Sequence, residues 1–197
     1  MDTGRGSDLV AAARAIAKDV LAVGLPRRWS HVCGVAGRAR EINSMLPADD
    51  AAALVAAAWL HDIGYAPELV DTGFHPLDGA RWLRQREFDP RVTVLVANHS
   101  SALIEADERG LAGDLAAEFP AERSVAADAL VYCDLTTGPH GQPVDVVERL
   151  VEIRTRYAPD SVVVRFVDRA EADLIATVRR VEVWLRDGGL RTADQAR

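Results

Sequence analysis

The sequence AAALVAAAWLHDIG, residues 51–64, is an apolar stretch that ends in a histidine, an aspartate, an isoleucine and a glycine. Two aspartates at 49–50 precede it, and their charges suit the positive end of a helix. Gly64 is a residue type that commonly follows the end of a helix. We therefore expect a helix that presents His61 and Asp62 together at its terminus. Adjacent side chains on a helix point about 100° apart, so a site at the helix end suits the pair better than a helix face.

Apolar residues elsewhere in the chain also recur at steps of three and four, which is the period of a helix. One such stripe follows Ser30, a candidate helix cap, and consists of Val32, Val35, Ala39, Ile42 and Leu46. Gly34 and Gly37 in the same segment would let a neighbouring helix approach closely. A later stripe consists of Val147, Leu150 and Val151.

The run VTVLV, residues 92–96, has the composition of a strand but also fits helical spacing. Its surroundings are helical, so we predict a helix there too. The first predicted helix begins at Ser7 as its cap. The predicted helices cover residues 7–23, 30–46, 49–63, 76–86, 91–98, 122–135, 144–157 and 168–187.

These helices predict an all-α fold, a single-domain helical bundle over residues 7–187 with flexible tails at 1–6 and 188–197. The chain has 197 residues, which suffices for one domain with a sizeable core and is short for two. The glycine- and proline-rich segment 138–143 is expected to be a loop within the domain.

Charge and lysine content exclude several classes of function. The formal net charge is −7 and no long run of basic residues occurs, so we expect no DNA or RNA polymer as a partner, whereas a small phosphorylated ligand is allowed. Lys18 is the single lysine, which argues against Schiff-base chemistry and a phosphate-binding P-loop. Apolar stretches are shorter than the roughly 18 uncharged residues of a membrane span, and residues 1–8 lack the pattern of a secretion signal. We expect no membrane partner and a cytoplasmic location.

Polar residues at inward-facing helical positions form the main candidate site. Asp134 lies at helical spacing from Leu130 and Val131, and His99 lies at helical spacing from Val96. A lone buried carboxylate costs several kcal/mol unless a cation, a hydrogen-bond network or protonation compensates for it. One interpretation is a shared metal site, and the other is a set of unrelated polar groups that the nearby backbone satisfies.

Four polar residues of this all-helical chain resemble the metal ligands of the HD superfamily of metal-dependent phosphohydrolases: His31, His61, Asp62 and Asp134. Residues 61–64 read as the HDIG variant of that superfamily's motif. The resemblance covers roughly residues 28–136. It implies an all-α HD-type domain and is strongest to small stand-alone bacterial hydrolases of the superfamily.

The resemblance also implies which residues hold metal. It assigns one metal to these four residues and a second to His75 and His99, with Asp62 bridging both through its two oxygens. Imidazole and carboxylate groups suit divalent transition metals, here one or two ions, with iron or manganese favoured and zinc, nickel or cobalt as alternatives. His140, the remaining histidine, lies in the predicted loop and is expected to face solvent.

Such a metal site predicts a reaction. Two cations about 3.5–4 Å apart can lower the pKa of a bridging water and neutralise the charge of a phosphoryl group. We therefore expect hydrolysis of a small phosphoester or phosphoanhydride by a metal-activated hydroxide, with a nucleotide as the favoured substrate and Asp62 as a catalytic residue. Side chains that could bind the substrate are Arg28, Arg38, Arg81, Arg84 and Ser100. An ordinary surface position, or local capping for the serine, is the alternative for each.

Differences from other members of the superfamily leave two further functions open. Mononuclear nucleotidases carry a glutamate shortly after the His-Asp pair, where this chain has the sequence GYA at 64–66, and cyclic-dinucleotide hydrolases carry a lysine in place of Tyr65. Di-iron oxygenases use the same six ligands but usually have a lysine nearby, which this chain lacks. A non-catalytic nucleotide-binding HD module would be favoured by a missing ligand, and none is missing. Cys33 and Cys133 are expected to be buried thiols that do not bind the metal.

Overall fold

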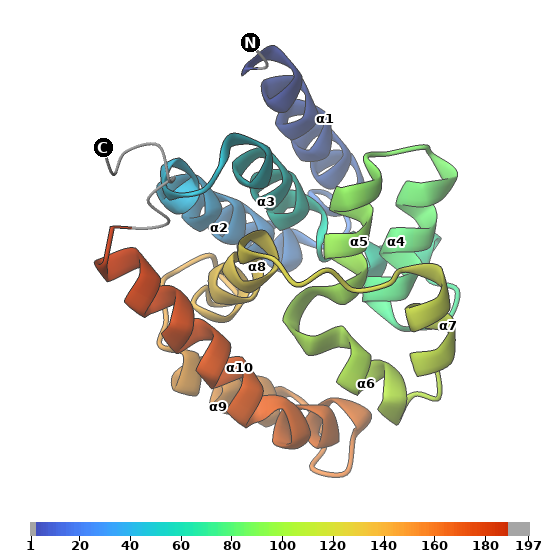
Figure 1. The fold of residues 1–197 in the computed structure, drawn as a ribbon. Coiled ribbons are helices and arrows are strands. Elements are labelled where there is room, and N and C mark those ends of the chain that lie inside the picture. The colour runs from blue at the N-terminus through green and yellow to red at the C-terminus, as the bar shows by residue number, and fades with distance from the viewer. Residues whose placement is uncertain (1–2, 189–197) are drawn as a thin grey trace.

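The computed structural model describes residues 3–188, which form helices and loops with no strand and one isolated bridge between Thr137 and Pro143. The predicted all-α fold is confirmed (Figure 1). The helices are α1 Thr3–Leu21, α2 Pro26–Ile42, α3 Ala48–Leu60, α4 His75–Gln85, α5 Pro90–Asn98, α6 Ala102–Glu108, α7 Ala112–Glu118, α8 Val125–Leu135, α9 Val146–Arg156 and α10 Val162–Arg186. Short 3-10 turns are η1 Asn43–Met45, η2 Ile63–Tyr65, η3 Pro67–Leu69 and η4 His99–Ser101. Over this part of the chain no helix combines the length and the apolar character that crossing a membrane requires. The cytoplasmic location stays a prediction.

Helix α3 is the centre of the bundle. Its residues from Ala53 to Leu60 are all buried, and it packs against α1, α2, α5 and α8 (Figure 1). A helix that is apolar on every face belongs in the interior of a domain, and its alanines let the neighbouring helices approach. The helix ends just before His61, so His61 and Asp62 emerge together in the middle of the fold, as the sequence predicts.

Gly64 allows a tight turn after this pair. A Cβ atom on Gly64 would lie 2.0 Å from the carbonyl oxygen of His75 and 2.7 Å from the backbone nitrogen of Gly79. A side chain would therefore force η2 away from α4. The close contact between η2 and the first turn of α4 places Asp62 beside His75.

The loop 138–143 packs against α2 at Gly34, where the sequence predicts the close approach of a helix. A Cβ atom on Gly34 would lie 2.5 Å from the Cα atom of Gly141, so only glycine fits there. At Gly37 nothing lies within 4 Å, and the predicted close contact at this residue is wrong. The loop brings the carbonyl oxygen of Gly138 next to α2.

Helices α1 and α2 begin earlier than the sequence predicts. Helix α1 begins at Thr3, and the hydroxyl of Ser7 donates a hydrogen bond to the carbonyl of Gly4 instead of capping the helix. Helix α2 begins at Pro26. Proline suits the first helical position because the N–H group that it lacks would have no partner there. Ser30 lies inside that helix and donates a hydrogen bond to the Pro26 carbonyl.

The predicted tails are only partly covered by the structure. Residues 3–6 belong to α1, which corrects the predicted helical domain start at residue 7. Residues 1–2 and 189–197 lie outside the described residues, so the flexible tails expected there stay predictions.

Helices α9 and α10 pack against each other and cover one side of the bundle (Figure 1). Helix α10 begins at Val162, after the capping Ser161, and thus before its predicted start. The predicted stripe of α9 is displaced, since Val147 and Val151 are 41% and 52% exposed whereas Arg149 is 5% exposed. The buried face of α9 is rotated by about 100°, one residue, so it carries an arginine.

Candidate metal centre

Six polar side chains from distant parts of the chain converge as two groups of three. The first group consists of His31, His61 and Asp134, and the second of Asp62, His75 and His99. Each residue offers one ligand atom, and the three atoms of a group lie within 4.8 Å of one another. The residues come from α2, the end of α3, the start of α4, η4 and α8. The structure therefore brings together all six residues that the resemblance assigns to metal, and their role as ligands stays a prediction.

The first group surrounds one oxygen of Asp134. Nε2 of His31 lies 3.0 Å from Oδ1 of Asp134, and Nε2 of His61 lies 3.9 Å from the same oxygen. Oδ2 of Asp62 lies 3.4 Å from Nε2 of His61 and 3.8 Å from Nε2 of His31. Oδ2 of Asp62 therefore lies next to the two histidines of the first group.

The other oxygen of Asp62 faces the second group. Oδ1 of Asp62 lies 3.4 Å from Nε2 of His75, and the Nε2 atoms of His75 and His99 are 3.1 Å apart. Asp62 thus lies between the two groups with one oxygen directed at each. This is the arrangement that a bridging carboxylate requires.

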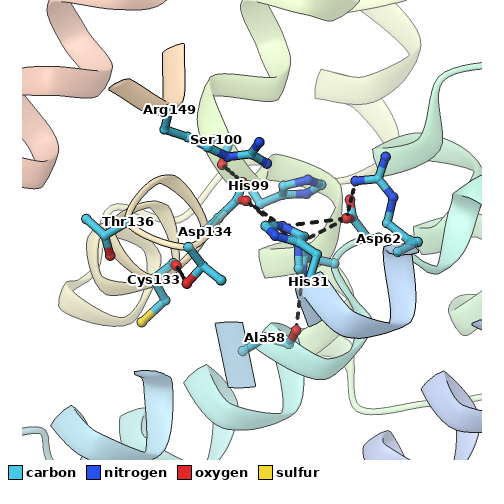
Figure 2. Close-up of polar contacts among 12 residues, drawn as sticks. His31, Ala58, Asp62, His99, Ser100, Cys133, Asp134, Thr136 and Arg149 are labelled. Atoms are coloured by element: carbon cyan, nitrogen blue, oxygen red, sulfur yellow. Dashed lines mark hydrogen bonds and ion pairs between the residues drawn. The ribbon is translucent and has the colours of Figure 1, made fainter. Parts of the chain in front are cut away.

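Backbone carbonyls orient three of the imidazole rings, one of them from Ala58 (Figure 2). The Nδ1 atoms of His31, His61 and His99 lie 3.1, 2.9 and 2.7 Å from the carbonyl oxygens of Gly138, Ala58 and Val96, respectively. A carbonyl oxygen only accepts hydrogen bonds, so each Nδ1 carries the proton. The Nε2 atom of each ring then points into the centre, as in histidines that bind metals.

His61 shows that these residues fit a cation. Its Nε2 atom is buried and has no hydrogen-bond partner within residues 3–188. A buried polar atom without a partner costs about 1–3 kcal/mol, and a cation would satisfy it. Four imidazoles and two carboxylates form a donor set that suits divalent iron, manganese, zinc, nickel or cobalt better than calcium.

Both carboxyl groups of the centre stay ionised although they are buried. Burial would raise the pKa of Asp62, but Arg28, whose Nη1 lies 2.6 Å from Oδ2, holds that pKa well below its usual value. Burial would also raise the pKa of Asp134, but a hydrogen bond with His31 and the nearby His61 lower it. Both groups are therefore negatively charged at neutral pH, which is the form that binds a cation.

The histidines of the second group are neutral. Burial lowers the pKa of His75 well below its ordinary value, and the opposing effect of Asp62 does not restore it. Burial also lowers the pKa of His99, and the nearby His61 adds to that shift. Neutral imidazole is the form that a metal needs.

Tyr65 connects Arg28 to the second group. The guanidinium carbon of Arg28 lies 3.9 Å from the centre of the Tyr65 ring, which is a cation–π contact. The same ring stacks on His75 with centroids 4.0 Å apart and an interplanar angle of 18°. Arg28, one of the predicted substrate-binding residues, therefore lies at the centre.

Ser100, another predicted substrate-binding residue, also lies at the centre. Its hydroxyl donates a hydrogen bond of 2.6 Å to Oδ2 of Asp134 (Figure 2). Ser100 and Ser101 have φ angles of 49° and 60°, which residues other than glycine rarely adopt. This strained turn places the side chains of His99 and Ser100 on the same side as Asp134.

The three other predicted arginines lie elsewhere. Arg38 donates a hydrogen bond of 2.9 Å to the hydroxyl of Tyr132, because it lies about two turns along α2 from the centre. Arg81 and Arg84 both pair with Glu118, at 2.5 Å each. Around the axis of α4, Arg81 and Arg84 are rotated by about 240° and 180° from His75, so their side chains point away from the side that His75 faces. None of these three arginines lines the cavity over the centre, and their contact with substrate stays a prediction.

A cavity of about 90 Å³ lies over the two groups. Its far side is apolar and comes from α9 and α10, with Leu150, Ile153, Val163, Phe166, Val167 and Leu174. Arg149 and Arg156 also line it, and the sequence analysis missed both. Their spacing of seven residues places both on one face of the helix, but the apolar stripe predicted for this segment indicated a different face.

Three residues expected to lie outside the centre do so. His140 is exposed, and neither cysteine belongs to a group of potential ligands among the described residues. Cys133 is buried, and its sulfur points away from the histidines (Figure 2). Cys33 is half-buried, which corrects its predicted burial, because its place on α2 is near Arg14 and Arg40 at the surface.

Comparison with known proteins places the chain in a family. Searches of curated proteins and of solved structures find no match. A family model described as HD domain matches residues 28–172, a span that holds all six residues of the two groups. The chain therefore belongs to the HD-domain family, whose members are mostly metal-dependent phosphohydrolases.

Proposed function

We propose that this protein is a metal-dependent phosphohydrolase that cleaves a small phosphoester or phosphoanhydride, with a nucleotide as the substrate. The observation that carries this proposal is the position of Asp62, whose two oxygens face two groups of potential metal ligands. Membership of the HD-domain family supports metal-dependent hydrolysis in general.

We assign the ligands as the resemblance implies. One divalent ion is held by His31, His61, Asp62 and Asp134, and a second by His75 and His99 together with Asp62, with iron or manganese preferred. When bound, such ions lower the pKa of a coordinated water and offset the charge of the phosphoryl group. We assign Asp62 as the catalytic residue because it would bind both of the ions that activate the water.

The chain's own residues prepare this centre. Backbone carbonyls fix three imidazole rings, and Ser100 holds Asp134 through a hydrogen bond of 2.6 Å. Stacking on Tyr65 holds His75 and Arg28 in place. Arg28 supplies a positive charge and N–H donors for phosphate oxygens beside the reacting group.

The dimensions and charge of the site favour a small substrate. The cavity over the centre has a volume of about 90 Å³ and an apolar far side, which limits the amount of water near the reacting phosphoryl group. The formal net charge of −7 disfavours a nucleic-acid polymer. A single nucleotide, with most of its bulk outside the cavity, meets both conditions.

Metal analysis of the purified protein, followed by assays with a panel of nucleotides, tests this function. We expect one or two transition-metal ions per chain and release of phosphate or of a nucleoside phosphate. Oxygen consumption without phosphate release would instead identify a di-iron oxygenase. Nucleotide binding without any product, in protein that is fully loaded with metal, would identify a non-catalytic module.

A further inference from the structure

Two hollows meet at three arginines beside the metal centre. The cavity of about 90 Å³ over the centre and a cleft of about 350 Å³ share Arg28, Arg149 and Arg156 in their linings. The cleft is otherwise formed mainly by the start of α2 and the segment before it. Arg28 thus connects the cleft to the metal centre, where it contacts Asp62.

Arg149 is deeply buried at this junction. It is 5% exposed and reaches from α9 toward Ser100 and His99 (Figure 2). One terminal nitrogen donates a hydrogen bond to Glu152, but Nε has no hydrogen-bond partner within residues 3–188. A buried N–H group without an acceptor is unfavourable, so this position favours an acceptor supplied by a ligand.

A single carboxylate, that of Glu152, pairs with Arg149 and Arg156 of the junction and with the neighbouring Arg27. Glu152 forms ion pairs with Arg27 at 3.5 Å, with Arg156 at 2.9 Å and with Arg149. No other carboxylate of the described residues pairs with these three. Burial and repulsion by Arg149 lower the pKa of Arg156. The positive charge at the junction therefore exceeds the negative charge, which favours an anion.

Backbone groups add to this positive potential. Helix α2 begins at Pro26, beside the cleft, and the first N–H groups of a helix have no carbonyl partner within it. Glu105 also lines the cavity, but its carboxylate pairs with Arg109 at 2.6 Å, so its charge is already compensated.

We propose that Arg28, Arg149 and Arg156 form a subsite for a second phosphate group of the substrate, next to the phosphoryl group at the metal centre. The position of the first phosphate rests on the proposed function. A guanidinium group binds two phosphate oxygens through its planar fork. Arg149 and Arg156 share the one carboxylate of Glu152, so this pair keeps positive charge for a phosphate. The substrate is then a phosphoanhydride, and not a monoester of an uncharged alcohol.

During hydrolysis of the phosphoanhydride bond, the three arginines have a second role. One water is consumed, a P–O bond forms to the phosphorus at the metal centre, and the bond from that phosphorus to the bridging oxygen breaks. The second phosphate leaves with the bridging oxygen and its electron pair, and one proton passes to solvent. The three guanidinium groups stabilise the charge that develops on this leaving group.

Anion binding by the full chain without metal tests the subsite separately from catalysis. The protein is stripped with a chelator and dialysed, and its Tm is measured with inorganic pyrophosphate. We expect pyrophosphate to raise the Tm of the wild type and Arg156→Gln to remove most of that rise. Arg154→Gln is the matched control and should keep it, because Arg154 lies on the same helix at 26% side-chain exposure, against 24% for Arg156, and lines neither hollow. Arg149→Gln should behave like Arg156→Gln, and the latter alone carries the test if the former does not fold.

Activity after metal is restored gives a second reading. Arg156→Gln is expected to lower kcat/KM for ADP about tenfold or more and that for AMP by less than about twofold. Arg154→Gln should change neither value.

The outcomes separate the subsite from the proposed function. If no nucleotide is hydrolysed but the rise with pyrophosphate depends on Arg156, the proposed function fails and the subsite stands. If nucleotides are hydrolysed but pyrophosphate does not raise the wild-type Tm, the subsite is overturned and the proposed function stands. Equal loss of the rise in Arg154→Gln and Arg156→Gln also overturns the subsite.

Discussion

The carbonyl oxygen of His75 lies 2.0 Å from the position that a Cβ atom on Gly64 would take. Carbon and oxygen atoms that are not bonded do not approach so closely, so the absence of a side chain at Gly64 allows η2 to lie against α4. The same contact sets Asp62 beside His75, with Oδ1 and Nε2 3.4 Å apart. One glycine thus supports both the packing of α4 and the geometry of the candidate metal centre.

Gly64→Ala is expected to lower the free energy of unfolding by at least about 2 kcal/mol, because backbone atoms must move to admit the methyl group. Urea unfolding of the metal-free protein measures this change. Gly37→Ala is the control, since nothing lies within 4 Å of a Cβ atom at that helical position. It should leave stability unchanged or raise it by up to about 1 kcal/mol. Equal losses in the two variants would contradict the role of Gly64.

Asp62→Asn is expected to reduce both metal content and hydrolysis, the latter by at least about 100-fold, because one oxygen of Asp62 faces each group of potential ligands. Elemental analysis by mass spectrometry measures the metal per chain. His140→Ala serves as the control and should retain full metal content, since His140 is exposed and lies in a loop. Undiminished metal and activity in Asp62→Asn would rule out the bridging position.

The stability of the metal-free protein is expected to fall on mild acidification. Burial lowers the pKa of His75 and His99 in the folded state, whereas in the unfolded chain both titrate near pH 6.5. Below about pH 6.5 the unfolded state binds protons that the folded state does not, so the free energy of unfolding decreases as the pH falls toward the lowered pKa values. The slope should reach at most about 1.4 kcal/mol per pH unit for each histidine.

Urea unfolding at about pH 7 and about pH 5.5 checks this pH dependence. His99→Asn should flatten it, because one of the two histidines with a lowered pKa is gone, and His140→Ala should leave it unchanged. A free energy of unfolding that is the same at both pH values would show that the two histidines do not behave as buried neutral groups.

The two cysteines are expected to differ in reactivity. Cys133 is buried, and burial raises the pKa of its thiol, whereas Cys33 is half-buried. A chromogenic disulfide reagent should therefore modify one thiol per chain in the native protein and both after unfolding. Cys33→Ser should abolish the native reaction, and Cys133→Ser should preserve it. Rapid native modification of both thiols would contradict the described packing of α8.

The sequence by itself determined the features that depend on residues close together in the chain. The apolar period identified most of the helices, and the end of α3 placed His61 and Asp62 at one terminus. Helical spacing also predicted that Asp134 and His99 point inward, and both are buried. These inferences hold because the direction of a side chain follows from the period of its own helix.

Only the tertiary structure decided which arginines reach the centre. Arg38 and Arg81 follow predicted ligands closely in the sequence, yet the rise and rotation of their helices carry them to other partners. Arg149 and Arg156 are far from every predicted ligand in the sequence, but the packing of α9 brings them to the cavity. A helical period fixes the relative directions of side chains along one helix, whereas the face that meets a site is set by packing against helices distant in the chain.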